Sequence, residues 1–287
     1  MYKIAVDIGG TNIKIAVFNT DLDMLAHESI KTPDNKKTLI IDTVHDLIAK
    51  YIQHYQLERP HIGISTAGVV DTERKAIIYA GPTIANYNDT DFQQHLGDLS
   101  DHITVHNDVD AALLGELVLH KYPESHIFCL TLGTGIGGAF YTQQHGLYTG
   151  ARYHANEIGY LLYRSSDGLT YEQRASTSAL KALIKAYGLD ANISVPALFD
   201  LAEADDKQSV QLLNDWGNAV AEGIAQIQII YDPDLILIGG GISSQGDRLI
   251  QYIEPHIQHY LPHGYGGARL QTTRTKNHAA LYGALVE

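Results

Sequence analysis

The chain has 287 residues, of which 45% are hydrophobic and 18% charged, and it carries a formal net charge of −13 at pH 7. This length exceeds what one minimal core requires, so we expect one long domain or two lobes. The acidic balance argues against nonspecific nucleic-acid binding, and no apolar run reaches the roughly 18 residues that a membrane-spanning helix needs. A nucleotide ligand stays compatible with this charge, because backbone N–H groups and a metal ion can bind phosphates locally.

The N-terminal residues enter a strand-like segment without the basic and then apolar layout of a secretion signal, so we expect a cytoplasmic protein. The single cysteine, Cys129, lies in the apolar run IFCLTL, and we interpret it as a buried core thiol. The 15 histidines are scattered, with no HExxH motif and no Cys/His pairing at zinc spacing. These patterns predict no metal site of those kinds.

Apolar and β-branched residues predict strands over 2–8, 13–19 and 24–30, joined as hairpins. The glycine-rich turn after the first strand leads into another strand, whereas the turn of a dinucleotide-binding βαβ unit leads into a helix. A Rossmann fold is therefore disfavoured. Beyond this meander the patterns predict helices over 38–55, 91–96 and 109–120 and strands over 61–68 and 103–108.

The opening pattern of strand, glycine-rich turn and strand returns at residues 127–141. The rest of the chain predicts helices over 207–230, 247–260 and 277–286 and a strand over 235–238. The repeat predicts two lobes of related design, residues 1–115 and 116–274. The C-terminal helix, about 275–287, is expected to return to the first lobe.

The two glycine-rich turns are candidates for binding a triphosphate. The first candidate set is Asp7, Gly9, Gly10, Thr11 and Asn12, and the second is Gly133, Thr134, Gly135 and Gly137. Glycines remove the Cβ atoms that would keep a phosphate away from backbone N–H groups. Each turn alone is equally compatible with a plain hairpin. Two such turns, one from each of two facing lobes, predict that a triphosphate binds between them. Asp7 would then orient Mg²⁺, directly or through water.

A third glycine run and a carboxylate complete the candidate site. Gly239, Gly240 and Gly241 follow a strand, where they allow a base or ribose to approach the backbone, although such a run is often only a tight turn. Phosphoryl transfer to a hydroxyl also needs a base. Asp108, beside Asn107 at the end of a strand, is the candidate. Its alternative role is a helix N-cap, and the two roles can coexist.

The segments DIGGTNIK, HNDVDAALLGE, LTLGTGIGGA, NEIGY and DPDLILIGGG, in this order, resemble the ROK family of sugar kinases and sugar-responsive repressors over nearly the whole chain. Within the family the chain is most similar to N-acetylmannosamine kinases that lack a zinc site. The resemblance implies an α/β, two-lobe, actin-like (ribonuclease-H-like) ATPase fold with a central cleft. It also implies ATP and Mg²⁺ as cosubstrates, a small sugar as substrate, and a homodimer.

The resemblance also implies roles for single residues. Asp108 matches the family's catalytic base, and Asn107 matches a contact to a sugar hydroxyl. Two loops, Ser65 to Gly68 and Gly81 to Tyr87, match loops that line the sugar pocket. The positions assigned to the sugar are Ser65, Gly68, Thr83, Asn107, Glu157, Tyr160 and Glu172, with Thr83 standing where many members have asparagine.

One departure concerns zinc. Family members usually carry a histidine where this chain has Tyr160, followed by cysteines that help to hold a structural zinc ion. Residues 161–172 contain no cysteine, so we expect no structural zinc. We hypothesise that Tyr160, Tyr163 and Tyr171 pack this loop instead. The change also bears on sugar specificity, because the missing histidine normally touches the sugar.

The expected activity is ATP-dependent phosphorylation of N-acetylmannosamine, at O6, in sialic-acid breakdown. One alternative is a glucokinase or another hexose or N-acetylhexosamine kinase. A sugar-responsive repressor is disfavoured, because no helix-turn-helix segment precedes the first strand and the charge is acidic. A binding protein without activity is disfavoured, because Asp7, both glycine turns and Asp108 are all present.

Overall fold

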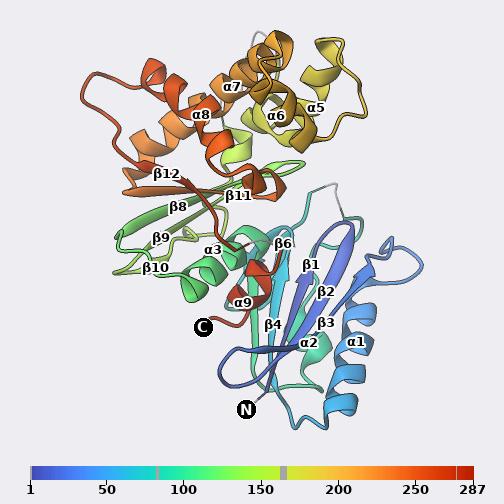
Figure 1. Ribbon diagram of the computed structural model, residues 1–287. Coiled ribbons are helices and arrows are strands. Elements are labelled where there is room, and N and C mark those ends of the chain that lie inside the picture. The colour runs from blue at the N-terminus through green and yellow to red at the C-terminus, as the bar shows by residue number, and fades with distance from the viewer. Residues whose placement is uncertain (1, 82–83, 162–166, 276) are drawn as a thin grey trace. The chain divides into compact units, whose positions relative to one another are not determined.

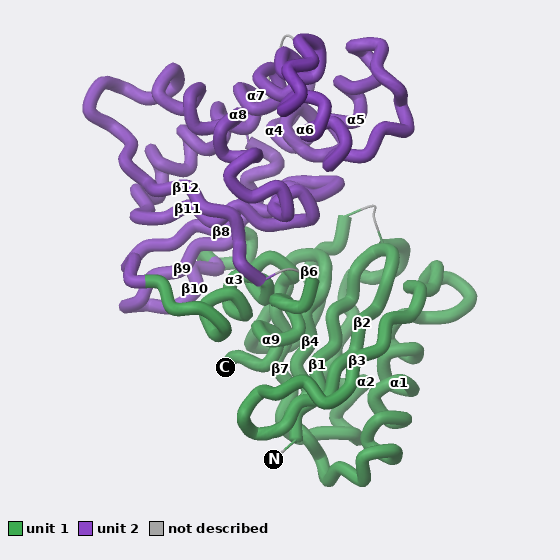
Figure 2. Tube along the Cα trace, in the orientation of Figure 1, with its two compact units in different colours: residues 1–122, 150–154, 277–287 green, residues 123–149, 155–276 purple. Residues whose placement is uncertain are grey.

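The computed structural model describes residues 2–81, 84–161, 167–275 and 277–287 (Figure 1). Strands and helices are mixed along the chain, which makes this an α/β protein. The chain divides into two compact units (Figure 2). Unit 1 comprises Met1–Tyr122, Gly150–His154 and Asn277–Glu287, and unit 2 comprises Pro123–Thr149 and Ala155–Lys276. Among the described helices, none is long and apolar enough to cross a membrane.

Unit 1 is built on a five-stranded sheet of order β3-β2-β1-β4-β7. Its strands are β1 (Lys3–Ile8), β2 (Asn12–Phe18), β3 (Met24–Lys31), β4 (His61–Thr66) and β7 (Ile103–Asn107). The first three strands pair antiparallel, which confirms the predicted hairpins, while β4 and β7 run parallel to β1. Because side chains alternate along a strand, β1 is buried on both faces.

Helices cover both faces of this sheet (Figure 1). They are α1 (Ile40–Tyr55), α2 (Phe92–Leu96), α3 (Asp108–Leu119) and α9 (Ala279–Gly283), and a two-stranded sheet of β5 (Val69–Asp71) and β6 (Ala76–Tyr79) lies in the same unit. Helix α1 was predicted from residue 38 but begins at Ile40, because the side-chain oxygen of Asn35 accepts the N–H of Ile40 over 2.7 Å. Helix α9 is shorter than the predicted 277–286.

The C-terminal helix α9 packs closely on α3 through glycines. A Cβ atom at Gly115 would lie 1.8 Å from the carbonyl oxygen of Ala279, and one at Gly283 would lie 1.8 Å from that of Ala111. No side chain fits at such distances, so glycine is required on both helices. This contact joins the end of the chain to a helix that begins at Asp108.

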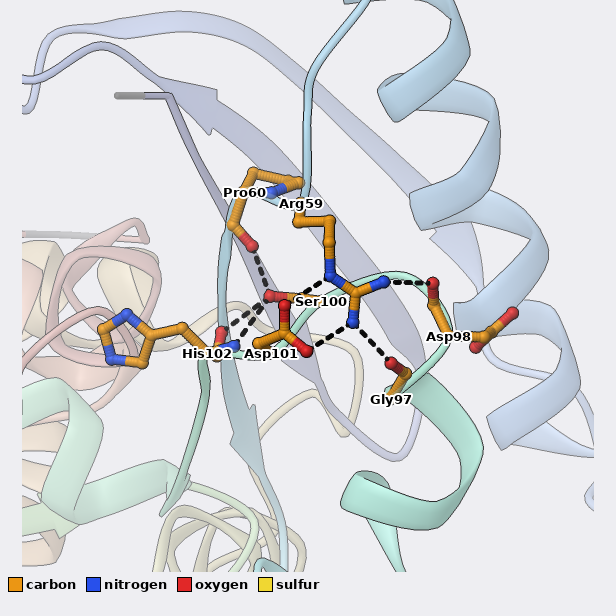
Figure 3. Close-up of polar contacts among 7 residues, drawn as sticks. All are labelled: Arg59, Pro60, Gly97, Asp98, Ser100, Asp101 and His102. Carbon is orange, nitrogen blue, oxygen red and sulfur yellow. Dashed lines mark hydrogen bonds and ion pairs between the residues drawn. The ribbon is translucent and has the colours of Figure 1, made fainter.

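Arg59, just before β4, contacts Asp101, just before β7, and so joins the amino ends of the two strands (Figure 3). Its guanidinium makes two contacts with the Asp101 carboxylate, at 2.5 and 2.6 Å. It also donates to the carbonyl oxygens of Gly97 and Asp98, at 3.0 and 3.2 Å, just after helix α2. These contacts lie at the amino ends of β4 and β7, so they are remote from the carboxyl ends of the same strands.

Unit 2 repeats the strand pattern of unit 1, with a five-stranded sheet of order β10-β9-β8-β11-β12. The strands are β8 (His126–Leu132), β9 (Ile136–Thr142), β10 (Gly146–Leu147), β11 (Leu235–Gly239) and β12 (Arg269–Thr272). The hairpin of β8 and β9 confirms the strand, turn and strand predicted at 127–141. Cys129 is 1% exposed in β8, as expected of a core thiol.

The helices of unit 2 surround a large apolar core. They are α4 (Tyr171–Ala175), α5 (Thr177–Ala186), α6 (Val195–Glu203), α7 (Lys207–Tyr231) and α8 (Asp247–Ile257), with short 3₁₀ turns η1 (Ile158–Tyr160), η2 (Gly241–Gln245) and η3 (Gln258–Tyr260). The predicted helices 207–230 and 247–260 are confirmed, the second with its last turn in 3₁₀ form. Helix α7 ends where Asp232 takes a left-handed conformation with φ of 44°, directly before Pro233.

Candidate functional site

The carboxyl ends of three adjacent parallel strands bring several of the expected residues together in unit 1. Strands β1, β4 and β7 are in register, so that Asp7 lies beside Ser65, and Thr66 beside Asn107. The hydroxyl of Ser65 donates to Asp7 Oδ1 over 2.9 Å. Ligand sites of open α/β sheets commonly lie at this edge.

Lys14 is a member of this group that the sequence reasoning missed. Its Nζ lies 2.9 Å from Asp7 Oδ2, and the side chains are 29% and 13% exposed. The two residues are direct partners across the β1–β2 hairpin. Since directly opposite residues project from the same face of a sheet, the hairpin register was a signal that could have found Lys14.

The Asp7 carboxylate has both oxygens engaged, one by Ser65 and one by Lys14. Each oxygen accepts one of these hydrogen bonds and keeps further lone-pair capacity. The carboxylate could therefore orient a bound Mg²⁺ directly or through water. Among the described residues, no group of three or more His, Cys, Asp or Glu side chains is arranged to hold a metal ion.

Asn107 and Asp108 occupy different positions at the start of α3. Asn107 is the N-cap: its Oδ1 accepts from the N–H groups of Val109 and Asp110 at 2.8 and 3.3 Å, and its Nδ2 donates to the carbonyl oxygen of Gly68 at 2.9 Å. Asp108 is the first helical residue, half-buried, and its Oδ1 accepts from the N–H of Val109 over 3.0 Å. The principal cap is therefore Asn107.

Gly68 and the loop around Tyr87 flank this edge. Gly68 has φ of +104°, and a Cβ atom there would lie 2.7 Å from the carbonyl oxygen of Tyr79, so the position requires glycine. Tyr87 is buried and shares a hydrogen bond of 2.8 Å with Thr66. Burial raises the pKa of the Tyr87 phenol, which keeps the hydroxyl protonated. Thr83, a predicted sugar contact in the same loop, lies outside the described residues.

A cavity of about 470 Å³ adjoins the first glycine turn. Its lining residues are Gly10, Lys31, Thr32, Pro33, Asp34, Ile84 and Ala85. Asn35, 3% exposed, joins the two segments that line the cavity: its Nδ2 donates to the carbonyl oxygens of Ala85 and Asn86 at 2.7 and 3.2 Å. Neither Lys31 nor Thr32 was singled out from the sequence.

The second glycine turn, in unit 2, is bonded to the segment that contains Glu172. Glu172 Oε2 accepts from the N–H of Ile136 over 2.9 Å. A Cβ atom at Gly135 would lie 2.4 Å from the same oxygen, so glycine lets the carboxylate reach the turn. Glu172 was predicted to contact a sugar, and the structure gives it a second task in holding this turn. Gly137 lies inside β9, paired with Thr131, rather than in the turn itself.

A second cavity, of about 340 Å³, is bordered by this turn and by the triple glycine. Its lining residues are Leu132, Gly133, Thr134, Thr177, Lys181, Val195, Pro196, Gly241, Ile242, Ser244 and Gln245. Gly240 has φ of +84°, and a Cβ atom there would lie 2.4 Å from the carbonyl oxygen of Leu132, whereas one at Gly241 would meet nothing within 4 Å. Gly240 thus lets η2 approach the turn, and Gly241 leaves the cavity open.

The structure describes two of the three tyrosines expected to replace zinc, Tyr160 and Tyr171. Tyr171 is fully buried, its hydroxyl donates to the carbonyl oxygen of Val220 over 2.9 Å, and its ring lies against Gly223 of α7. Burial raises the pKa of Tyr171. Tyr160, in contrast, is 62% exposed. Tyr163 lies outside the described residues. Glu157 is exposed and directly precedes η1.

Comparisons with known proteins agree with this architecture. The model of the ROK family matches residues 3–286. An uncharacterized protein of Clostridium perfringens is 33% identical over 97% of this chain and 95% of its own, and the β-glucoside kinase of Klebsiella pneumoniae is 28% identical over 98% and 94%. The crystal structure of a Streptococcus pneumoniae ROK family protein in complex with sucrose is similar, with a TM-score of 0.83, 26% identity and coverage of 99% and 96%. The predicted α/β, actin-like fold is confirmed.

Proposed function

Because the chain belongs to the ROK family, we propose that it is a sugar kinase, which transfers the γ-phosphoryl group of ATP to a sugar hydroxyl with Asp108 as the catalytic base. The observation that carries this proposal is the position of Asp108. It is the first residue of α3, directly after the carboxyl end of β7, while the neighbouring Asn107 takes over the capping of the helix. The Asp108 carboxylate accepts the N–H of Val109 and lies beside the capping residue, at the carboxyl end of β7.

In the proposed reaction, Asp108 accepts the proton of the attacking sugar hydroxyl, which makes the oxygen a better nucleophile for in-line transfer. Asn107, held by its bond to Gly68, would orient the sugar. When bound, Mg²⁺ supplies positive charge that neutralises the phosphate oxygens. Asp7 would hold the hydrated ion, and the N–H groups of the two glycine turns would bind phosphate oxygens.

The nucleotide base and ribose are proposed to occupy the cavity of unit 2. The cavity has apolar walls at Val195, Pro196 and Ile242, which suit a flat base, and polar groups at Ser244 and Gln245. Gly241, the last residue of the triple glycine, lines this cavity, and we propose that Gly239, Gly240 and Gly241 contact the adenosine. The remaining sugar contacts are proposed to come from Ser65, Gly68, Glu157, Tyr160 and Glu172.

For the substrate we propose N-acetylmannosamine, phosphorylated at O6, on the strength of the sequence resemblance. A second candidate is a β-glucoside, which is favoured by the name of the Klebsiella pneumoniae relative. The test is an ADP-release assay with Mg-ATP across N-acetylmannosamine, N-acetylglucosamine, glucose and cellobiose. The highest kcat/KM with N-acetylmannosamine would support the first candidate, and the highest with cellobiose or glucose would replace it. No ADP release with any sugar would contradict the proposed kinase activity.

We also propose that the protein acts in the cytoplasm as a homodimer, as the family resemblance implies. Light scattering coupled to size exclusion would measure the mass of the particle against the 31.5 kDa of one chain. A particle of one chain at micromolar concentration would contradict the dimer.

A further inference from the structure

Each glycine-rich turn is bonded to a threonine outside it. In unit 1, Thr32 donates its N–H to the carbonyl oxygen of Thr11 over 2.9 Å and its hydroxyl to that of Gly9 over 2.6 Å. In unit 2, Thr177 donates both its N–H and its hydroxyl to the carbonyl oxygen of Gly133, at 2.9 and 2.5 Å. The two threonines come from different kinds of element: Thr32 directly follows strand β3, and Thr177 is the first residue of helix α5. In both units, therefore, a threonine hydroxyl donates to a carbonyl oxygen of the glycine-rich turn.

These bonds determine which way the turns present their N–H groups. In a trans peptide unit the carbonyl of one residue and the N–H of the next point in opposite directions, and no described peptide bond is cis. Since the carbonyl of Gly133 is directed at Thr177, the N–H of Thr134 is directed away from α5. The carbonyl of Gly9 is directed at Thr32, so the N–H of Gly10 is directed away from that residue in the same manner.

Ser178 extends the arrangement by one peptide unit. Its hydroxyl donates to the carbonyl oxygen of Thr134 over 2.8 Å, which directs the N–H of Gly135 away from α5. Within the described part of the chain, the N–H groups of Gly10, Thr134 and Gly135 make no hydrogen bond to another backbone or side-chain group. Consecutive N–H groups that point the same way form a concave site for anionic oxygens.

A lysine lines the cavity beside each turn. Thr32 and Gly10 line the cavity of unit 1 together with Lys31 and Asp34. Thr177 lines that of unit 2 together with Lys181, one helical turn further along α5. In unit 2 the charge of Lys181 favours an anionic ligand beside the N–H groups of Thr134 and Gly135. In unit 1 Asp34 offsets Lys31, so the preference for an anion rests there on the N–H group of Gly10.

We propose that Thr32 and Thr177 are positioning residues that preorganise the two glycine turns for the phosphates of the nucleotide, with Ser178 assisting in unit 2. This proposal rests on the proposed kinase function. Neither threonine needs to touch the nucleotide, because each acts through the carbonyl oxygens of its turn. Preorganised donors bind an anion without the cost of rearranging at the moment of binding.

The decisive variants remove one hydroxyl and keep the backbone bond. Thr177→Val and Thr32→Val leave the N–H bond intact, whereas Thr177→Ser and Thr32→Ser restore a hydroxyl. The control is Ser176→Ala, which removes the N-cap of α5, where Ser176 Oγ accepts from the N–H of Ala179 over 3.2 Å, without touching the turn. The readouts are MgADP affinity by calorimetry, KM for MgATP and for the sugar, and the melting temperature.

We expect Thr177→Val and Thr32→Val each to weaken MgADP binding and to raise KM for MgATP by about 3- to 10-fold, the effect of losing one hydrogen bond. The KM for the sugar should stay within about twofold. The serine variants should restore nucleotide affinity, and Ser176→Ala should lower the melting temperature without changing nucleotide affinity.

Unchanged MgADP affinity in both valine variants of an active protein would overturn the inference and leave the kinase proposal intact. The inference would equally fail if Ser176→Ala weakened nucleotide binding as much as Thr177→Val, because the effect would then come from helix stability. A wild-type protein that neither binds MgADP nor phosphorylates any sugar would overturn both proposals.

Discussion

The side-chain amide of Asn107 donates a hydrogen bond to the carbonyl oxygen of Gly68 over 2.9 Å while its oxygen caps helix α3. One side chain thus ties the start of the helix to a residue beyond the end of β4. Because Asp108 is the next residue in the chain, Asn107 fixes the backbone from which the proposed base projects. The geometry of this site depends on a contact between segments that are distant in sequence.

Replacing the proposed base should affect turnover far more than binding. We expect Asp108→Asn to lower kcat by more than about 10²-fold, since general-base catalysis contributes that much or more, and to leave sugar affinity nearly unchanged. Rapid-quench or coupled assays measure kcat, and calorimetry measures sugar binding. Asp110→Asn, in the same helical turn, is the matched control. Near-normal turnover of Asp108→Asn would remove Asp108 as the base.

The two functions of Asn107 can be separated by two substitutions. Asn107→Asp keeps an acceptor for the N-cap but loses the donor to Gly68, whereas Asn107→Ala loses both. We expect Asn107→Ala to lower the free energy of unfolding by about 1 kcal/mol, the usual effect of losing an N-cap, and Asn107→Asp to lower it less. Both should raise KM for the sugar. Equal unfolding free energies for the two variants in urea titrations would contradict this separation.

The glycines Gly240 and Gly241 should respond differently to alanine. Gly240→Ala places a Cβ atom 2.4 Å from the carbonyl oxygen of Leu132 on a backbone with φ of +84°. We expect a loss of about 1–3 kcal/mol in unfolding free energy, from strain and overpacking. Gly241→Ala meets no atom within 4 Å and should stay within about 0.5 kcal/mol of wild type. Chemical unfolding of both variants gives the comparison, and equal losses would show that φ and steric contact do not set the difference.

A buried histidine predicts loss of stability in mild acid. His61 is 3% exposed and stacks on His102, with ring centroids 3.9 Å apart. Burial, with smaller contributions from neighbouring positive groups, lowers the pKa of His61 from 6.5 to about 4. The unfolded chain therefore binds a proton that the folded chain does not, between these two values. Its contribution to stability is complete above about pH 6.5 and is lost as the pH falls toward 4.

Urea unfolding at about pH 7.5 and about pH 5 measures this contribution, which we expect to amount to about 2 kcal/mol. His61→Gln should reduce the pH dependence, while His54→Gln, at an exposed position of α1, should leave it unchanged. Burial also lowers the pKa of His106, so part of the pH dependence should remain in His61→Gln. An identical pH dependence in wild type and His61→Gln would exclude His61 as its source.

Much of the local structure followed from the sequence. The alternation of apolar residues predicted β1, β2 and the β8–β9 hairpin, and the 3.6-residue period predicted α7, because these patterns depend on neighbours along the chain. Boundaries were less well predicted. Helix α1 begins at Ile40 because Asn35 caps it from outside the expected helix, and Leu39 offers no capping side chain. Tyr160 is 62% exposed, which the pattern of one short loop did not predict.

The sequence by itself determined where the glycine turns, the strand ends and Asp108 lie along the chain, since strand periodicity and glycine spacing are local properties. Only the tertiary structure decided that Thr32 and Thr177 bond to those turns, and that Glu172 reaches Ile136. These partners are separated along the chain, and each bond exists because the fold brings two backbone segments within hydrogen-bonding distance. No local sequence pattern predicts these hydrogen bonds, because they depend on the packing of the whole unit.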